Sequence, residues 1–281
     1  MSKILVVDDD RTTRHLLQTV LSNAGYSTSV AKDGVEALKA LRTEQFDVLL
    51  LDIWMPRMNG LDVLAKLRTR KKRPRVVVMT SDDAPETLLM AVREQAFKYV
   101  HKPVQPPALL ETVRAALESP DLPRIEVISA KPDWVELVVP CSREAAERIQ
   151  PVMAELDAKL SPEIRDSTAY AFRELLLNAI EWGGRLDPNR HVRISCLRTK
   201  RMLLYRIADP GPGFDIDDLP HAAISYPDAP IKHMQVREEQ GIRPGGFGLL
   251  TVQASVDELL YNEKRNEVVF IKYLIGERET S

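Results

Sequence analysis

Cysteine, net charge and long apolar runs are all scarce in this sequence of 281 residues. The two cysteines, Cys141 and Cys196, lie far apart, which excludes a zinc site or redox motif built from paired cysteines. The formal net charge of −2 gives no general attraction to nucleic acid or to an anionic membrane. No apolar run approaches the roughly 20 residues of a membrane-spanning helix, so we expect a cytoplasmic location and no membrane partner.

The composition is that of packed globular protein, with 44% hydrophobic and 28% charged residues. The length suits two domains of ordinary size. Between them, the segment 118–124 contains two prolines and little periodicity, which indicates a short, semi-stiff linker. We predict a first domain over residues 1–118, a linker over 119–131 and a second domain over 132–277.

The first half alternates between apolar runs of strand length and helical patterns. The apolar runs cover residues 4–7, 48–51 and 76–79, and the helical patterns cover 11–24, 35–41 and 61–68. Continuous apolar runs are typical of parallel strands that are covered on both faces. This alternation predicts an α/β fold with a doubly wound parallel sheet and right-handed crossovers.

Polar side chains follow the strands of this predicted sheet. They are Asp8, Asp9 and Asp10 after the first run, Asp52 after the second, Thr80 and Ser81 after the third, and Lys102 after Tyr99 and Val100. Carboxylates gathered at one edge repel one another unless a hard cation such as Mg²⁺ lies among them. With the cation, Asp52 could attack a phosphoryl group while Lys102 neutralises charge on the transferred oxygens. Asp10 has a simpler alternative, as a helix cap.

These residues belong to motifs that resemble the response-regulator receiver family over about residues 1–118. The motifs are Val6-Val7-Asp8-Asp9, Leu51 to Pro56 with Asn59-Gly60, Met79-Thr80-Ser81, and Tyr99 to Pro103. The resemblance implies a (βα)5 receiver fold and a two-component partner, either a phosphodonor histidine kinase or a phosphotransfer protein. The implied roles are Asp52 as phosphoacceptor and metal ligand, Asp8, Asp9 and the Trp54 backbone carbonyl as further Mg²⁺ ligands, Thr80 as the phosphate-sensing hydroxyl, Lys102 as phosphate partner and Tyr99 as switch residue. A cis peptide between Lys102 and Pro103 is implied as well.

The second half predicts a strand over 134–139, a helix that begins near Ser142, a long helix over 162–182, and a strand pair over 191–197 and 202–208. In the long helix, Glu174 and Asn178 lie one turn apart on the same face. Asn178 interrupts an apolar run, and a buried amide needs a partner, which a metal ion bridging phosphates could provide.

Two glycine-rich loops come next in the sequence. The first begins at Asp209 and contains Gly211 and Gly213; the second begins at Arg243 and contains Gly245, Gly246 and Gly248. Glycine lets the backbone approach a ligand closely, Asp209 could accept a hydrogen bond from an adenine amino group, and amides at a helix start could bind phosphates. Either loop alone could equally be a simple turn. The irregular segment between them, with several prolines, predicts a lid.

The order of these boxes resembles the GHKL (histidine-kinase-like) ATPase family over about residues 130–275. The resemblance implies an α/β sandwich with helices on one face of a mixed sheet, and Mg²⁺-ATP as cofactor. The implied roles are Asn178 as Mg²⁺ holder, Asp209 as adenine reader, Glu174 as candidate general base, and Gly211, Gly213, Gly245, Gly246 and Gly248 as the backbone that admits phosphates and base. Within the family, the arrangement resembles the anti-sigma-factor serine kinases. Glu181 departs from them, because those relatives often carry a basic residue there.

Three functions are compatible with this organisation. The first is a response regulator whose ATP-bound output domain is a serine/threonine protein kinase that acts on an anti-sigma-factor antagonist. The second is a non-catalytic, ATP-dependent module that sequesters a sigma factor or another regulator. The third is a histidine-kinase remnant that works with a separate histidine-bearing protein. Direct DNA binding is not expected, because no helix-turn-helix with a basic recognition helix is apparent in the second half. The oligomeric state is open, with a homodimer as one alternative.

Overall fold

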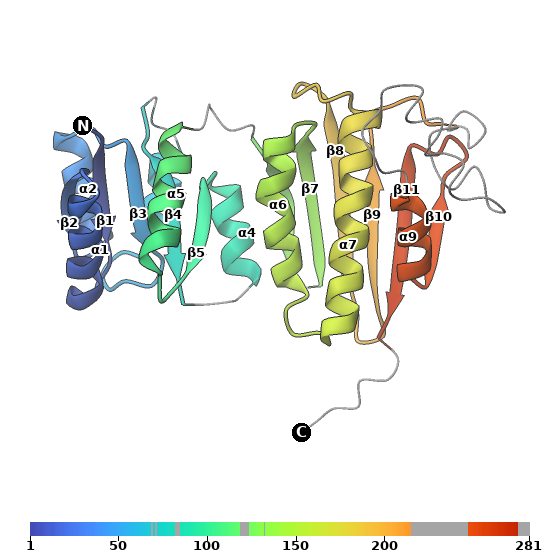
Figure 1. The fold of residues 1–281 in the computed structure, drawn as a ribbon, viewed down its shortest axis with the longest axis horizontal. Helices are drawn as coiled ribbons and strands as arrows, with labels where there is room; N and C mark the ends of the chain where they lie inside the picture. The colour runs from blue at the N-terminus through green and yellow to red at the C-terminus, as the bar shows by residue number, and fades with distance from the viewer. Residues whose placement is uncertain are drawn as a thin grey trace. The chain divides into compact units, whose positions relative to one another are not determined.

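The computed structural model describes residues 1–68, 70, 72–81, 85–118, 124–131, 133–214 and 247–274. The chain divides into two compact units, Met1–Leu122 and Pro123–Ser281, whose helices and strands are labelled in Figure 1. The boundary falls inside the segment 119–131 that the sequence predicts as a linker. Within the described ranges, every helix is too short or too polar to cross a membrane.

The first unit is a five-stranded parallel sheet of order β2-β1-β3-β4-β5. The strands are β1 (Lys3–Val7), β2 (Ser27–Ala31), β3 (Val48–Asp52), β4 (Arg75–Thr80) and β5 (Lys98–His101), and the helices are α1 (Arg11–Asn23), α2 (Gly34–Thr43), α3 (Gly60–Leu67), α4 (Pro85–Arg93) and α5 (Pro106–Glu118). The predicted doubly wound fold is therefore confirmed. Asp10 is the N-cap of α1, where its side chain accepts a 2.6 Å hydrogen bond from the Thr13 amide.

Alternate residues of β1, β3 and β4 enter two separate cores, one on each face of this sheet. Leu5, Leu49 and Val76 belong to one cluster, and Ile4, Leu50 and Val77 belong to the other. Because these strands are buried on both faces, each contains a continuous apolar run, which covers residues 4–7, 48–51 and 76–79. The first polar side chains therefore appear where the strands end.

The second unit contains a six-stranded sheet of order β10-β11-β9-β8-β7-β6 with helices packed on it (Figure 1). The strands are β6 (Glu126–Lys131), β7 (Trp134–Pro140), β8 (His191–Arg198), β9 (Met202–Ala208), β10 (Glu258–Tyr261) and β11 (Glu267–Tyr273), and the helices are α6 (Arg143–Leu156), α7 (Pro162–Asn178), the π-helical turn η1 (Ala179–Gly183) and α9 (Gly248–Ser255). Ser142 is the N-cap of α6, as the sequence predicts.

Two expectations about this unit are wrong. Every strand pair in the described sheet is antiparallel, so the sheet is not mixed. Two helices, α6 and α7, separate β7 from β8, and this pair of helices returns the chain so that β8 runs opposite to β7. In addition, residues 126–131 of the predicted linker form β6, which pairs with β7 as the edge of the sheet.

The core between helices and sheet contains a stack of aromatic rings and one buried acid. Tyr205 stacks on Phe270 with ring centroids 4.9 Å apart and packs against Phe172 at 5.5 Å. The Tyr205 hydroxyl donates a 2.7 Å hydrogen bond to Asp157, the C-cap residue of α6. Both cysteines are buried, and burial raises the pKa of Cys141 to about 11 and of Cys196 to about 12, which agrees with unreactive thiols.

Asp157 gives the second unit a stability that depends on pH. Burial raises the pKa of its carboxyl from 3.8 to about 6, against the opposing effects of Tyr205 and Arg198. The folded state binds this proton more tightly than the unfolded state, so protonation of Asp157 stabilises the fold. This stabilisation is complete below about pH 4 and is lost as the pH rises through 6. The free energy of unfolding changes by about 3 kcal/mol over this range. We expect Asp157→Asn to remove this dependence from the unfolding free energy, measured by urea denaturation between pH 4 and 7. Asp166→Asn, at an exposed site of α7, is the control; an unchanged pH profile in Asp157→Asn would contradict the assignment.

Candidate functional sites

Three carboxylates meet at the carboxyl edge of the first sheet. Asp8, Asp9 and Asp52 each offer an oxygen, and these atoms all lie within 4.8 Å of one another. Asp8 and Asp52 are buried, whereas Asp9 is exposed. Carboxylate oxygens at this spacing, with one side open to solvent, form a donor set suited to a hard divalent cation.

Lys102 connects two members of this acidic cluster. Its Nζ lies 2.6 Å from Asp8 Oδ2 and 2.8 Å from Asp52 Oδ2. Burial disfavours the charge on Lys102, but hydrogen bonds and charge from Asp52 and Asp8 raise its pKa overall, so the ammonium is retained. Burial also raises the pKa of Asp52; Lys102 opposes this rise and the charge of Asp8 adds to it. A cation bound among the carboxylates would lower the pKa of Asp52 again.

Three further residues predicted for the receiver site lie near the carboxyl edge of the first sheet: Thr80, Tyr99 and Trp54. Thr80 is the last residue of β4 and is fully buried, and its carbonyl accepts a 2.8 Å hydrogen bond from the Lys102 amide. Tyr99 packs against the core and its ring meets that of His101 edge-on, with centroids 5.7 Å apart. The Trp54 side chain is 54% exposed, and its amide donates to Asp52. The Lys102–Pro103 peptide is cis, as the receiver resemblance implies.

Asn59 and Gly60 fix the loop that returns from β3 to α3. The Asn59 side chain accepts a 2.8 Å hydrogen bond from the Asp62 amide and caps α3. A Cβ on Gly60 would overlap the carbonyl oxygen of Asp52 and lie 2.9 Å from the Ile53 Cα. The start of α3 therefore packs directly on the backbone that carries Asp52, and only glycine fits there.

In the second unit, the residues predicted to bind the nucleotide lie along α7 and η1. Glu174 and Asn178 lie one turn apart near the end of α7, and both are half-buried. A Cβ on Gly248, the first residue of α9, would lie 2.5 Å from Glu174 Oε2. The acid of the helix and the end of the second glycine loop are therefore adjacent in space.

The loop that contains Asp209 lies beside η1, at the end of this helical segment. The Gly211 amide donates a 2.7 Å hydrogen bond to Asp209 Oδ1, and the Asp209 amide donates to the Asn266 carbonyl. Burial raises the pKa of Asp209, opposed by the Gly211 amide and by Arg190. Gly213 has a φ of +88°, and a Cβ there would overlap the carbonyl oxygen of Lys264. The first glycine loop thus packs tightly on the turn between β10 and β11.

Several residues that shape this site are not among those predicted from the sequence. A Cβ on Gly183 would overlap the Asp209 carboxyl, and one on Gly184 would overlap Cys141 Sγ. Two consecutive glycines at the end of the predicted long helix were the sequence feature that could have indicated these close contacts. Glu181 forms a 3.0 Å ion pair with Arg143, so its charge is partnered by α6. Gly245, Gly246 and the predicted lid lie outside the described residues.

Comparisons with known proteins divide the chain in the same way. Residues 4–114 match the family described as Response regulator receiver domain, and residues 139–272 match the Histidine kinase-like ATPase domain. The chain is 34% identical over 202 residues to the DNA-binding response regulator MtrA of Mycolicibacterium paratuberculosis. This alignment covers 70% of this chain and 88% of that relative. It is 37% identical over 139 residues to the Response regulator MprA of Mycobacterium sp. (strain KMS), covering 47% of this chain and 60% of that relative. The solved structure of the chemotaxis response regulator CheY4 of Vibrio cholerae is 32% identical and covers 42% of this chain and 99% of its own, with a TM-score of 0.40.

Proposed function

We propose that this chain, which belongs to the response-regulator family, uses phosphorylation of Asp52 to control an ATP-binding output domain that acts as a serine/threonine protein kinase. The observation that carries the receiver part is the convergence of Asp8, Asp9 and Asp52 with the Lys102 ammonium. The output part is supported by the match of residues 139–272 to histidine-kinase-like ATPases and by the adjacency of Glu174 and Gly248.

At the receiver site, Asp52 is the nucleophile. One carboxylate oxygen attacks the phosphorus of the donor, a P–O bond forms, and the donor histidine leaves as the P–N bond breaks. Asp8, Asp9, Asp52 and the Trp54 carbonyl would hold Mg²⁺, which supplies positive charge to the transferred phosphoryl oxygens. Lys102 leaves its ion pair with Asp52 to pair with the phosphoryl group, because the Asp52 carboxylate loses its charge when it becomes an acyl phosphate.

The switch depends on the new charge at the sheet edge. A phosphoryl group adds about −1.5 to −2 of charge, and its oxygens accept hydrogen bonds strongly. The Thr80 hydroxyl, at the end of β4, turns to donate to it, and the Tyr99 ring fills the space that Thr80 leaves. Both residues lie on adjacent strands, so the change is passed to the surface formed by β4 and β5.

In the output domain, Asn178 would hold the Mg²⁺ of Mg²⁺-ATP, Asp209 would accept a hydrogen bond from the adenine amino group, and glycines 211, 213, 245, 246 and 248 would admit phosphates and base. Glu174 would take a proton from a substrate hydroxyl as general base. The resemblance to anti-sigma-factor serine kinases makes a small antagonist protein the proposed substrate. If transfer is absent, sequestration of a sigma factor by the ATP-loaded domain is the next candidate, and cooperation with a separate histidine-bearing protein is the third.

The test is calorimetry of Mg²⁺-ATP binding to the full chain, with and without beryllofluoride as phosphoryl mimic. We expect binding that Asn178→Ala weakens by at least tenfold, and an affinity that beryllofluoride changes in the wild type but not in Asp52→Asn. Phosphate transfer from ATP to candidate antagonist proteins is then measured with Glu174→Gln as control. Absence of ATP binding would overturn the proposed output function, whereas tight binding without transfer would leave the sequestering module and the histidine-kinase remnant as the alternatives.

DNA binding is a further alternative to test, because a relative whose alignment covers 70% of the chain is named as a DNA-binding response regulator. The described second unit offers an antiparallel sheet with helices and no basic recognition helix. In the basic run 68–75, Arg70 donates to the Leu41 carbonyl and Arg73 to the carbonyls of Glu94 and Gln95. We therefore expect no binding to duplex DNA in a fluorescence anisotropy titration at roughly physiological salt, where a DNA-binding regulator would still bind its site.

A further inference from the structure

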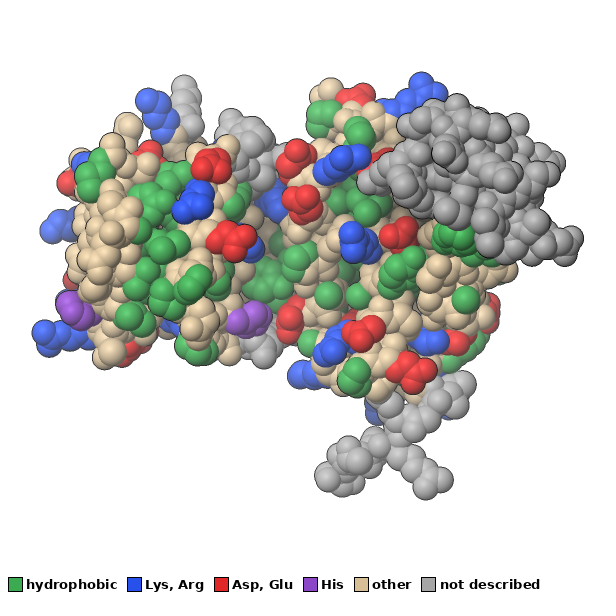
Figure 2. Space-filling view, in the orientation of Figure 1, with side chains coloured by type: hydrophobic (Ala, Val, Ile, Leu, Met, Phe, Trp, Pro, Cys, Tyr) green, Lys and Arg blue, Asp and Glu red, His purple; other side chains and the backbone are tan. Residues whose placement is uncertain are grey.

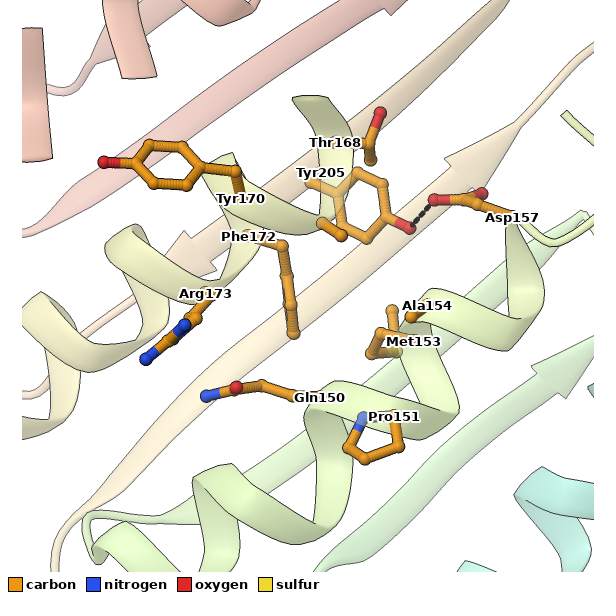
Figure 3. A pocket seen from close by; sticks show the side chains of 11 residues that line it. Gln150, Pro151, Met153, Ala154, Asp157, Thr168, Tyr170, Phe172, Arg173 and Tyr205 are labelled. Carbon is orange, nitrogen blue, oxygen red and sulfur yellow. Dashed lines mark hydrogen bonds between the residues drawn. The ribbon is translucent and has the colours of Figure 1, made fainter. Parts of the chain in front are cut away.

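The two faces of the second sheet have different surroundings. The described helices of this unit, α6, α7 and α9, lie on one face (Figure 1). Figure 3 shows the Tyr205 side chain of β9 on this helix side, where it bonds to Asp157. Successive side chains of a strand point to opposite faces, so Leu204 and Arg206 point away from the helices. We call this second face the outer face.

A row of apolar side chains crosses the outer face. Partners in an antiparallel pair point to the same face, so the pairing register identifies the row that contains Leu204. From β6 to β10 the row reads Lys131, Trp134, Leu197, Leu204, Ile271 and Glu258. Four neighbouring apolar side chains are therefore flanked by a base at one edge of the sheet and by an acid at the other.

Further apolar side chains widen this row on both sides. Met202 pairs with Tyr273 on one side of it, and Val269 pairs with Leu260 on the other. Trp134 and Tyr273 are each 39% exposed, and Leu260 is 53% exposed. The helix side differs, because Figure 2 shows acidic and basic side chains interspersed with hydrophobic ones over α6 and α7. A contiguous apolar surface of this kind marks the outer face as an interaction surface.

The charges at the two ends of the row indicate the partner. Lys131 is exposed, Glu258 accepts a hydrogen bond from the Tyr273 hydroxyl, and neither forms an ion pair with another described residue. If two copies pack face to face about a two-fold axis along the strands, between β8 and β9, the row is reversed in the second copy. Lys131 then meets Glu258 of the second copy, and Trp134 meets its Ile271. A two-fold axis along the row would instead place Lys131 on Lys131, so only the reversed arrangement is complementary in charge.

We propose that the outer face joins two copies of this chain into a two-fold sandwich of sheets. Leu197 and Leu204 lie next to the axis and form the apolar centre, and the pairs of Lys131 with Glu258 close its edges. Sheets packed in this way lie about 10 Å apart, with strand directions within about 30° of each other. The residues predicted to bind the nucleotide lie along α7 and η1, on the other face of each sheet, so the dimer leaves both candidate sites outside the interface.

The first test is sedimentation equilibrium of the full chain without nucleotide or phosphodonor. We expect a dimer whose dissociation constant Leu204→Asp raises by at least a hundredfold, because it buries a carboxylate at the apolar centre. Leu16→Asp, the same change at a leucine of α1 that is 50% exposed, is the matched control and should leave the dissociation constant unchanged. Circular dichroism checks the fold of both variants.

The second test exchanges the charges at the ends of the row, where folding is less sensitive than at the centre. Lys131→Glu and Glu258→Lys should each weaken the dimer by about tenfold, because each places like charges opposite one another. The double variant should restore the wild-type dissociation constant, which the arrangement with the axis along the row would not do.

Three results would overturn the proposal. The first is a wild type that stays monomeric, which would leave the outer face to the first unit of the same chain or to another protein. The second is a dimer that Leu204→Asp and the single charge variants do not weaken, as expected for copies joined through the first unit or through the edge strand β6. The third is a double charge variant no tighter than either single one. None of these readouts depends on ATP binding or on Asp52 phosphorylation, so they stand apart from the tests of the proposed function.

Discussion

Replacing Asp52 with Asn is expected to reduce phosphorylation of the chain by acetyl phosphate by on the order of a thousandfold or more, as removal of an enzyme nucleophile does. The amide has nearly the same shape as the carboxylate and can keep the Trp54 amide as a neighbour, but it has no nucleophilic oxygen anion. Asp52 is the last residue of β3, and one of its carboxylate oxygens lies within 4.8 Å of an oxygen of Asp8 and of Asp9. Incorporation is measured with radiolabelled phosphodonor on the full chain.

Asp47 provides a matched control for this experiment. It lies immediately before β3, at the opposite end of the same strand, where it is exposed and accepts a hydrogen bond from the Lys3 amide. Asp47→Asn should leave phosphorylation unchanged. The label on the wild type should be lost in alkali, since an acyl phosphate hydrolyses readily there. Alkali-stable label, or equal incorporation in Asp52→Asn and wild type, would show that phosphate enters at another residue.

Replacing Gly213 with Ala is expected to destabilise the second unit by several kcal/mol and to abolish nucleotide binding. The position has a φ of +88°, which costs an alanine about 1–2 kcal/mol. In addition, the new methyl group would overlap the carbonyl oxygen of Lys264, and that oxygen belongs to the backbone, which cannot rotate away. Local opening free energies from hydrogen exchange in β9 and β11 measure the effect, since they report on this unit alone.

Gly25 distinguishes the cost of the backbone conformation from the cost of the steric overlap. It has the same φ of +88°, but a Cβ there would meet nothing within 4 Å. Gly25→Ala should therefore destabilise the first unit only through its left-handed backbone conformation, by about 1–2 kcal/mol. The local opening free energy from hydrogen exchange in β1 measures this effect. If Gly213→Ala costs its unit no more than Gly25→Ala costs the other, the contact with Lys264 imposes no constraint on the loop.

The acidic cluster of the first unit could be predicted because a parallel sheet simplifies the problem. Three of its strands, β1, β3 and β4, contain continuous apolar runs, so the first polar residue after each run marks the strand end, and these ends meet at one edge. Asp8, Asp52 and Lys102 come together for this reason, although they are far apart in the sequence. The geometry of the Lys102 bridge, in contrast, depends on side-chain packing that periodicity does not describe.

The second unit is less predictable for two physical reasons. The prolines at 120, 123 and 132 obscure the edge strand β6, which pairs as a hairpin with β7. The sequence pattern predicts α-helix as far as Trp182, whereas the last turn is π-helical from Ala179 to Gly183. The role of Gly183 against Asp209 depends on that turn, and no sequence pattern used for α-helices reports it.

The π-helical turn also makes this part of the chain sensitive to length. A π turn contains one more residue than the α turn it replaces, and the Gly184 amide accordingly bonds back to the carbonyl of Ala179, five residues earlier. Deleting a single residue here would leave an ordinary α turn, and the wider turn that brings Gly183 against Asp209 would be lost. Gly183 would then no longer face Asp209, although every chemical group of the site would still be present. Spacing within 179–183 is thus as much a requirement of the site as the identity of its side chains.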